Sequence, residues 1–400
     1  MLPYGGGTEI NMTGQVGNSR LIQRMNRLKV LNYIRRNPDA ARPKIARDTG
    51  LSLSSVTNIV TYLISVGLVC ENGAEQAERV GRKSIRLRFC ADAYGLVCVF
   101  LGVDSIDIAY TDLEGRIITR ICANAAAMTP KRMVELVREK VAGLVAEFGR
   151  EKILAIGVAI SGLVLDGSRF VLSASLKWKE FDIKSLLERE TELPVFVENM
   201  SFVKAVHYFF DVNHTGSDNM LFIDLDGGVG ACQYYGGVMN RAMLGEIGHT
   251  TVERDGEECF CGNRGCLEAM CSPQRMARLY AEYSGEPEES AAQALARGDA
   301  AAVRAADECA EYLGIGLANM VNLCRPSEII LNIGSFSGLH GVLDRAMNYM
   351  YKRAHPALCE NLVIREISVS GEDAVRAMAF DLCDRMFDVA YEGDFADGEN

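Results

Sequence analysis

One histidine and three cysteines lie close together in the sequence and carry the side chains that a structural zinc ion requires: His249, Cys259, Cys261 and Cys266. An imidazole nitrogen and three thiolates form a complete tetrahedral set, which leaves no open coordination position for catalysis. The alternatives are chance clustering and disulfide pairing. The segment is polar and offers no core to bury cysteines, and the reducing compartment inferred below disfavours disulfides. We therefore expect one structural zinc ion per chain.

A second group of residues suits the recognition of nucleic acid. Segment 53–66 has apolar side chains at helical spacing on one face, and its other face carries short polar residues, namely Ser54, Ser55, Thr57, Asn58 and Thr61. Such side chains suit base edges and phosphates. In the basic segment that follows, Arg79, Arg82 and Lys83 have the charge to contact backbone phosphate or the minor groove. The alternative is a small helical dimerisation module with a solvated basic face.

The elements expected to position these residues form a winged helix-turn-helix. Three helical patterns lie between about residues 18 and 66, and the second ends at Gly50. Ser52 has the side chain to cap the third helix. Ile85, Leu87 and Phe89 alternate with arginines, which predicts a strand of the wing. We expect an all-α winged helix-turn-helix domain over residues 18–90, with helix 53–66 in the major groove of DNA.

The distribution of charge supports this assignment, although the total charge does not. The chain has 400 residues and a net charge of −11, which alone argues against nucleic acid. Residues 1–90 hold 14 Lys and Arg against 6 Asp and Glu, a balance of +8, whereas the remaining residues hold 28 against 47, a balance of −19. The longest apolar stretches, 94–103 and 153–165, are too short to span a membrane, and the N-terminus lacks an apolar signal region. We expect a cytoplasmic protein without a membrane partner.

From about residue 91 onward, strand and helix patterns alternate in an order that occurs twice. The expected strands are 94–103, 106–110, 116–123, 153–160, 194–198, 220–225, 328–333 and 362–369, with a hairpin over 229–240. The expected helices are 129–149, 182–190, 201–210, 338–353 and 371–388, with further helices through 274–323. This repetition predicts a duplicated α/β body with a cleft between its halves. Residues 1–17 are expected to be disordered, and residues 389–400 to form an acidic tail.

The segment GEIGH at residues 245–249, followed by CxCGxxGCLE at 259–268, is similar to the signature of the ROK family of repressors, open reading frames and kinases. Supporting matches include LSLSSVTNIV, GVAISGLVLDG, VFVENMS, LFIDLDGGVGA and PSEIILNIG. The resemblance implies a two-lobed, actin-like ATPase body with ribonuclease H-like halves over residues 91–388. Lobe one would cover about 91–210 plus the C-terminal helix. Lobe two would cover about 211–370, with the zinc loop at 245–268.

The resemblance also separates two functions, since family members with a DNA-binding head look like sugar-responsive regulators and members without it are mostly sugar kinases. The first phosphate loop of the kinases reads D-x-G-G-T, which we match to residues 104–108, where Ile106 would obstruct a nucleotide and Asp107 would repel it. The catalytic Asp of the kinases follows an Asn, and here Asn199 is followed by Met200, which cannot accept a proton. We expect that the chain has no catalytic residue, does not use ATP as a cofactor and has no kinase activity.

The sugar-contacting positions of the family are better retained, and they are Asn199, Glu246, His249 and Glu268. Carboxylates and amides suit vicinal hydroxyls. A zinc ion that holds the loop between Glu246 and Glu268 would fix both carboxylates in place. Alternatively, both acids only support the zinc site or are solvated. The leading hypothesis is a repressor of carbohydrate genes that binds operator DNA as a homodimer or homotetramer and responds to a sugar or sugar phosphate. The alternatives are a sugar kinase with an accessory DNA-binding head, and a body that only dimerises.

Overall fold

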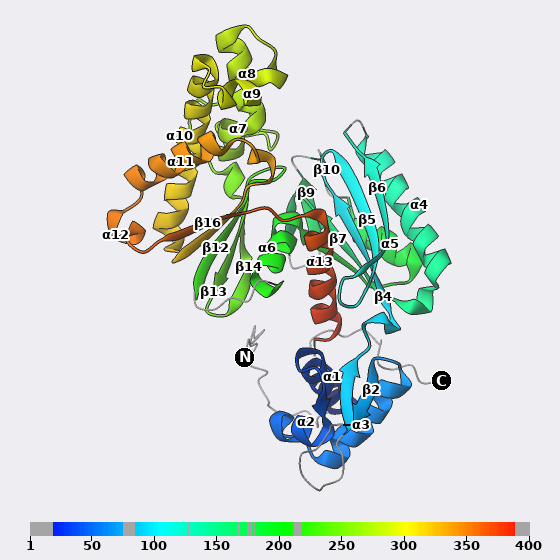
Figure 1. Ribbon diagram of the computed structural model, residues 1–400. Coiled ribbons are helices and arrows are strands. Elements are labelled where there is room, and N and C mark those ends of the chain that lie inside the picture. The colour runs from blue at the N-terminus through cyan, green and yellow to red at the C-terminus, as the bar shows by residue number, and fades with distance from the viewer. Residues whose placement is uncertain are drawn as a thin grey trace.

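The computed structural model describes residues 19–74, 85–126, 128–165, 169–173, 176, 178–179, 181–211 and 218–388. Figure 1 shows three parts, an N-terminal head and two lobes that lie side by side above it. Helices α6 (Met200–Asp211) and α13 (Gly371–Met386) lie between the two lobes. The expected N-terminal segment 1–17 and the acidic tail 389–400 lie outside the described residues.

The head consists of three helices and a small sheet. The helices are α1 (Ser19–Arg36), α2 (Arg42–Thr49) and α3 (Leu53–Ser65), and the strands are β1 (Ala40–Ala41), β2 (Val69–Ala74) and β3 (Ile85–Phe89). Gly50 takes the left-handed conformation that ends α2, and the Ser52 hydroxyl caps α3 by accepting a hydrogen bond from the Ser55 N–H at 3.0 Å. The expected all-α composition needs correction, because Ala40 pairs with Leu87 and completes a three-stranded sheet in the order β1-β3-β2.

Lobe one is built on a five-stranded sheet in the order β11-β7-β4-β5-β6. Its strands are β4 (Gly95–Leu101), β5 (Ser105–Asp112), β6 (Ile117–Asn124), β7 (Ile153–Ile160) and β11 (Val195–Asn199). Successive side chains of a strand point to opposite faces. Val97 and Val99 therefore pack with residues of α4 (Pro130–Phe148) and α5 (Ile183–Thr191), whereas Cys98 and Phe100 belong to the core that contains α6 and α13.

A small antiparallel sheet follows β7 in lobe one and was not indicated by the sequence patterns. Its strands are β8 (Leu163–Leu165), β9 (Arg169–Ser173) and β10 (Trp178–Lys179). All three are short, and β10 has only two residues, so periodicity gives little signal.

Lobe two repeats the plan of lobe one. Its sheet has the order β14-β13-β12-β15-β16, with strands β12 (Asn219–Asp224), β13 (Gly230–Tyr235), β14 (Val238–Gly245), β15 (Glu328–Asn332) and β16 (Val363–Ile367). In both sheets three strands form an antiparallel meander and two more join in parallel, as the expected duplication requires. The helices are α7 (Leu267–Cys271), α8 (Pro273–Ser284), α9 (Ala291–Ala296), α10 (Ala300–Cys324), α11 (His340–Arg353) and α12 (Pro356–Cys359).

The head and the body share one buried apolar cluster. Leu31 of α1 and Leu382 of α13 both belong to it. The Asn32 side-chain amide donates a hydrogen bond to the Phe387 carbonyl at 2.9 Å, and the rings of Phe89 and Phe387 meet edge to face with centroids 6.3 Å apart. The C-terminal helix therefore anchors the head. Within the described parts of the chain, no helix combines the length and the apolar character that crossing a membrane requires.

Candidate metal centre, effector cleft and nucleic-acid interface

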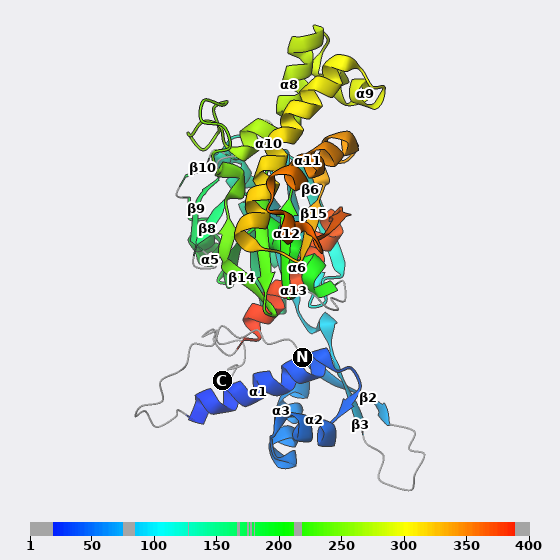
Figure 2. The ribbon, with the colours of Figure 1, turned by 90° about the vertical axis from the view of Figure 1, so that its left-hand side faces the viewer.

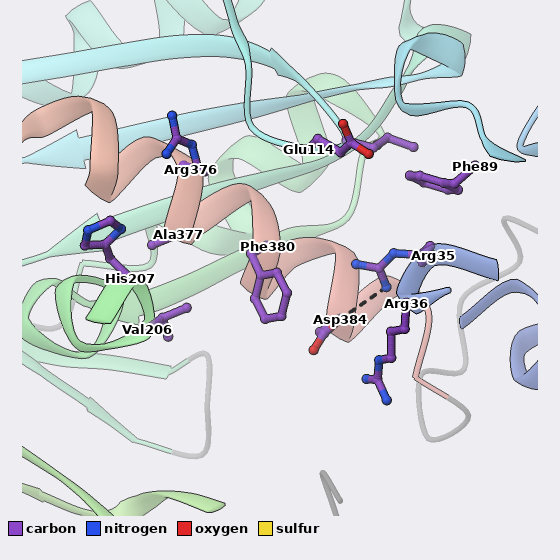
Figure 3. A pocket seen from close by; sticks show the side chains of 11 residues that line it. Arg35, Arg36, Phe89, Glu114, Val206, His207, Arg376, Ala377, Phe380 and Asp384 are labelled. Carbon is purple, nitrogen blue, oxygen red and sulfur yellow. Dashed lines mark hydrogen bonds and ion pairs between the residues drawn. The ribbon is translucent and has the colours of Figure 1, made fainter. Parts of the chain in front are cut away.

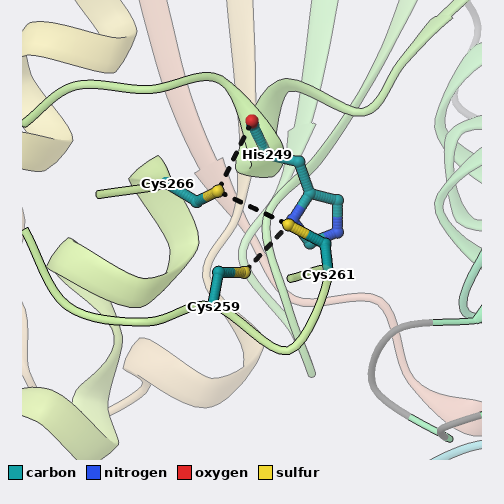
Figure 4. A group of neighbouring side chains, drawn as sticks. All are labelled: His249, Cys259, Cys261 and Cys266. Carbon is teal, nitrogen blue, oxygen red and sulfur yellow. Dashed lines mark hydrogen bonds between the residues drawn. The ribbon is translucent and has the colours of Figure 1, made fainter. Parts of the chain in front are cut away.

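The structure brings the four residues expected to bind zinc into one cluster, which Figure 4 shows. The ligand atoms of His249, Cys259, Cys261 and Cys266 all lie within 4.8 Å of one another. The His249 Nδ1 and Cys259 Sγ atoms are 3.5 Å apart, and the Cys261 and Cys266 sulfurs are 3.6 Å apart. Zn–S bonds of about 2.3 Å and Zn–N bonds of about 2.0 Å give tetrahedral edges of about 3.5–3.8 Å. The cluster is therefore compatible with a tetrahedral zinc ion.

Glycines let the zinc loop fold this tightly. At Gly265, with φ 65°, a Cβ atom would stand 1.5 Å from the Glu253 carbonyl oxygen, so no other residue fits there. The Cys259 N–H donates to the Asn263 carbonyl at 2.8 Å, which closes the turn that carries Cys261. These backbone constraints place three cysteines around His249.

The protein surroundings shift the pKa values of the three thiols in the cluster in different directions. Burial first, and then hydrogen bonding to Cys261, raises the pKa of Cys266 to about 12. Burial also raises the pKa of Cys259. Burial opposes ionisation of Cys261 as well, but the Asn263 N–H and the neighbouring thiols outweigh it and lower the Cys261 pKa. A metal ion would have to displace protons from this site, as thiolate ligands require.

Two glutamates, Glu246 and Glu268, lie at the two ends of the zinc loop. The Glu246 carboxylate lies 3.8 Å from His249 Nε2. Burial raises the pKa of Glu246, His249 opposes this effect, and the charge of Glu268 adds to it. Glu268 accepts a hydrogen bond from the Val229 N–H at 2.9 Å. The structure therefore brings both acids near the metal cluster and near each other.

A cavity of about 600 Å³ lies between the lobes. Of the four residues predicted to contact sugar, one lines this cavity. Glu268 lines the cavity, whereas Asn199, Glu246 and His249 do not. The Asn199 side chain is engaged locally, because its amide donates to the Gly162 carbonyl at 2.8 Å and its oxygen accepts from the Ser201 N–H at 2.8 Å to cap α6. A contact between Asn199 and a sugar would therefore have to use the second hydrogen of its side-chain amide.

The predicted role of residues 106–108 requires correction. The hairpin turn that faces the cavity comprises residues 102–104, and its Val103 and Asp104 line the cavity. Ile106 lies within β5 and is buried in the core of lobe one with 1% of its surface exposed. Asp107 pairs with Arg120 at 2.5 Å and does not line the cavity. Neither Ile106 nor Asp107 therefore forms part of the cavity wall. Within this hairpin, the charged residue at the cavity wall is Asp104 instead.

A buried lysine that sequence reasoning missed joins α6 to the end of β12 and to the glycine loop at residues 226–230. The Lys204 ammonium lies 3.2 Å from Asp224 and 2.9 Å from Asp226, and its side chain is 8% exposed. Burial alone would lower the pKa of Lys204, but Asp224 and Asp226 outweigh it and raise the pKa. Asn332 donates a further hydrogen bond to Asp224 at 2.7 Å. In a helical pattern Lys204 resembles a solvated residue, so only the packing of the lobe reveals this network.

Met200, at the expected position of the kinase base, is the first residue of α6 and packs against the apolar cluster that joins head and body. Its thioether supplies no group that accepts a proton. Met200 therefore contributes to the packing of the apolar cluster.

The outer face of α3 is polar, as expected for a helix that enters a groove of DNA. Val56, Ile59 and Val60 are buried, whereas Ser54, Thr57, Asn58 and Thr61 are exposed and Ser55 is half-buried. Figure 2 shows the β2–β3 hairpin extending from the head as a wing. Arg79, Arg82 and Lys83 lie outside the described residues. Sequence reasoning missed Lys44 and Arg47, which are exposed on α2, the helix that crosses the DNA backbone in this motif.

A pocket of about 210 Å³ lies at the junction of head and body (Figure 3). Arg35 of α1 pairs with Asp384 near the end of α13 at 3.2 Å, and both side chains are largely buried. Burial raises the pKa of Asp384, an effect that Arg35 and Arg36 oppose. Since α13 also packs against α6, whose N-terminus follows Asn199, packed elements connect the cleft with the head.

Comparisons with known proteins agree with this architecture. The profile of the ROK family matches residues 96–385. A xylose repressor of Bacillus spizizenii is 26% identical over 352 residues, which cover 86% of this chain and 91% of the repressor. A glucokinase of Halalkalibacterium halodurans is 28% identical and covers 69% of this chain and 92% of its own length. A solved ROK family transcriptional regulator, a homologue of the E. coli MLC protein, shares the fold with a TM-score of 0.74 and 22% identity, covering 92% of this chain and 98% of its own.

Proposed function

Because the chain belongs to the ROK family, we propose that it is a DNA-binding transcriptional repressor of carbohydrate genes that senses a sugar or sugar phosphate through a catalytically inactive kinase-like body. The observation that carries this proposal is the extent of similarity to the xylose repressor, which spans 86% of the chain and therefore includes residues of the head. The glucokinase covers 69% of the chain, close to the length of the body.

The head would bind double-stranded operator DNA. In this proposal Ser54, Ser55, Thr57, Asn58 and Thr61 contact bases or phosphates, and Arg79, Arg82 and Lys83 contact the backbone or minor groove. A homodimer or homotetramer would present two heads to a two-fold-symmetric site.

The body would bind the effector in the cleft. A single zinc ion, held by His249, Cys259, Cys261 and Cys266, would fix the loop that carries Glu246 and Glu268. Glu268 would contact sugar hydroxyls, with Asn199, Glu246 and His249 beside it. Effector binding would change how the lobes pack on α6 and α13, and the ion pair between Arg35 and Asp384 would pass this change to the head.

Two substitutions in the head should separate sequence recognition from phosphate binding. Asn58→Ala removes an exposed amide from α3 and should change the preferred DNA sequence, at a cost of about 1–3 kcal/mol for the correct base. Arg82→Ala should weaken binding to all sequences and reduce the dependence of log K on log salt by about one. Titration of labelled duplexes at several salt concentrations measures both effects. Equal binding of every duplex at physiological salt would contradict the regulator proposal.

The alternative function, a sugar kinase with an accessory head, predicts ATP turnover. We expect no ADP release above background with hexoses, pentoses or amino sugars, because Met200 supplies no base. We also expect none from Met200→Asp alone, because Glu268 and Lys204 still engage the glycine loop and its acids. A coupled ADP assay across the sugar panel measures this. Turnover by the unmodified protein at ordinary kinase rates would establish the alternative.

A further inference from the structure

We infer that the cleft accepts a polyhydroxylated ligand without negative charge, a neutral or amino sugar, and excludes sugar phosphates and nucleotides. The inference rests on the proposed function and narrows the class of its effector. Its basis is the glycine loop at residues 226–230. Glu268 occupies the place where such a loop would bind a phosphate anion, and Lys204 occupies the place where the neighbouring acids would bind a metal cation.

The anion position of this loop is filled by a carboxylate. Successive backbone N–H groups of such loops normally bind phosphate. Here the Gly227 N–H donates to the Ser335 hydroxyl at 2.9 Å, and the Val229 N–H donates to Glu268 at 2.9 Å. The same Glu268 oxygen lies 2.8 Å from the point where a Cβ atom at Gly228 would stand. A phosphate would have to displace Glu268 and then remain beside its charge.

The cation position is filled by an ammonium. Nucleotide phosphates bind together with Mg²⁺, which carboxylates hold through oxygen atoms. The Asp224 and Asp226 carboxylates are already bound by Lys204 at 3.2 and 2.9 Å, and Lys204 also lies 3.4 Å from the Asp226 carbonyl oxygen. A divalent ion would therefore meet a buried positive charge.

Among the described residues that line the cavity, the one basic side chain is already engaged by an acid. Arg278 is the one Lys or Arg among the described residues that line it, and its guanidinium is shared with Glu257 at 2.5 Å. Glu258 pairs with Arg264 at 2.8 Å. Asp104, from lobe one, and Glu268, from lobe two, form no ion pair with a Lys or Arg of the described chain. A phosphate group carries about −1.5 to −2 charges at neutral pH, so these two carboxylates would repel it.

The same two carboxylates favour hydroxyl and amino groups. An ionised carboxylate only accepts hydrogen bonds, and each sugar hydroxyl supplies one donor hydrogen. An ammonium group supplies three donors and a compensating charge. Because Asp104 and Glu268 belong to different lobes, a ligand that bridges them would also connect the lobes.

The test compares each sugar with its own phosphate on the full-length, zinc-loaded protein. Glucose, xylose, glucosamine and N-acetylglucosamine, the corresponding phosphates, and ATP with Mg²⁺ are titrated by calorimetry, with thermal shift as a second readout. We expect at least one neutral or amino sugar to bind, its phosphate to bind at least about tenfold more weakly, and ATP not to bind. Asp104→Asn should reduce the difference in affinity between each sugar and its phosphate. The control Glu360→Gln, at an exposed position outside the cavity, should leave this difference in affinity unchanged.

The outcomes separate this inference from the proposed function. A sugar phosphate that binds more tightly than its parent sugar would overturn the inference and leave the sensor function intact. Failure of every sugar and every phosphate to bind would contradict the inference and also the sugar-sensing part of the proposed function. Tight binding of ATP would overturn the inference and favour the kinase alternative.

Discussion

Replacement of Cys261 by serine is expected to reduce the bound zinc from one ion per chain to almost none. Serine is not ionised near neutral pH and cannot replace the thiolate in the cluster. The zinc-binding energy, about 10–16 kcal/mol for structural zinc in small zinc-finger peptides, would then no longer hold residues 246–268. Glu246 and Glu268 would lose their fixed positions, so sugar binding should fall together with the stability of lobe two. Elemental analysis and sugar titration of the purified variant measure both losses.

A matched control and a second measurement keep this prediction testable if the variant fails to fold. Cys122→Ser alters an exposed cysteine of β6, outside the cluster, and should retain zinc and sugar binding. In the unmodified protein, a chelator should increase amide hydrogen exchange first in the zinc loop. A metal-free protein that keeps its fold and its sugar response would contradict the proposed role of the cluster.

Lys204→Met is expected to destabilise the body by about 3–5 kcal/mol. The substitution keeps most of the side-chain volume and removes the positive charge, which leaves Asp224 buried with its side chain only 2% exposed. Removal of one partner of a buried ion pair has this cost because the other charge remains uncompensated. Denaturant unfolding at constant zinc measures the loss, and hydrogen exchange in α6 and β12 locates it.

Two further variants test the cause of that loss. Lys184→Met removes a partly exposed lysine of α5 that lies 3.8 Å from Glu188, so its effect should stay below about 1 kcal/mol. Lys204→Met combined with Asp224→Asn should recover part of the stability, because no buried charge is then left alone. Equal losses in the Lys204 and Lys184 variants would show that the Lys204 network contributes little.

Local signals in the sequence predicted most of the secondary structure. Gly50 ends α2 and Ser52 caps α3 because both act through backbone geometry that neighbouring residues determine. The alternation of Ile106, Ile108 and Tyr110 predicted a strand, and all three side chains are buried. The match of residues 104–108 to a phosphate loop placed Ile106 and Ile108 in a turn, whereas the turn of the hairpin comprises residues 102–104 and both isoleucines lie in β5.

The metal cluster could be predicted because the chemistry of its ligands is specific, and residue types alone identified all four members. The cleft could not be predicted in the same way. Asn199 matched the family pattern, yet its side chain caps α6 and bonds to Gly162, since the local geometry of β11 and α6 decides where it points. The contacts of Lys204 with Asp224 and of Glu268 with Val229 join elements that are distant in sequence. Such contacts depend on tertiary packing, which periodicity does not encode.

The central claim is that a sugar changes the affinity of this protein for a specific DNA sequence. The most direct test is fluorescence anisotropy at physiological salt, with a two-fold-symmetric duplex obtained by in vitro selection on the full-length protein, titrated with and without a saturating sugar. The account predicts binding at least about 10³-fold tighter than to a scrambled duplex and a change of about 5–150-fold in Kd when the sugar is added. Equal affinity for both duplexes, unaffected by any sugar, would contradict it.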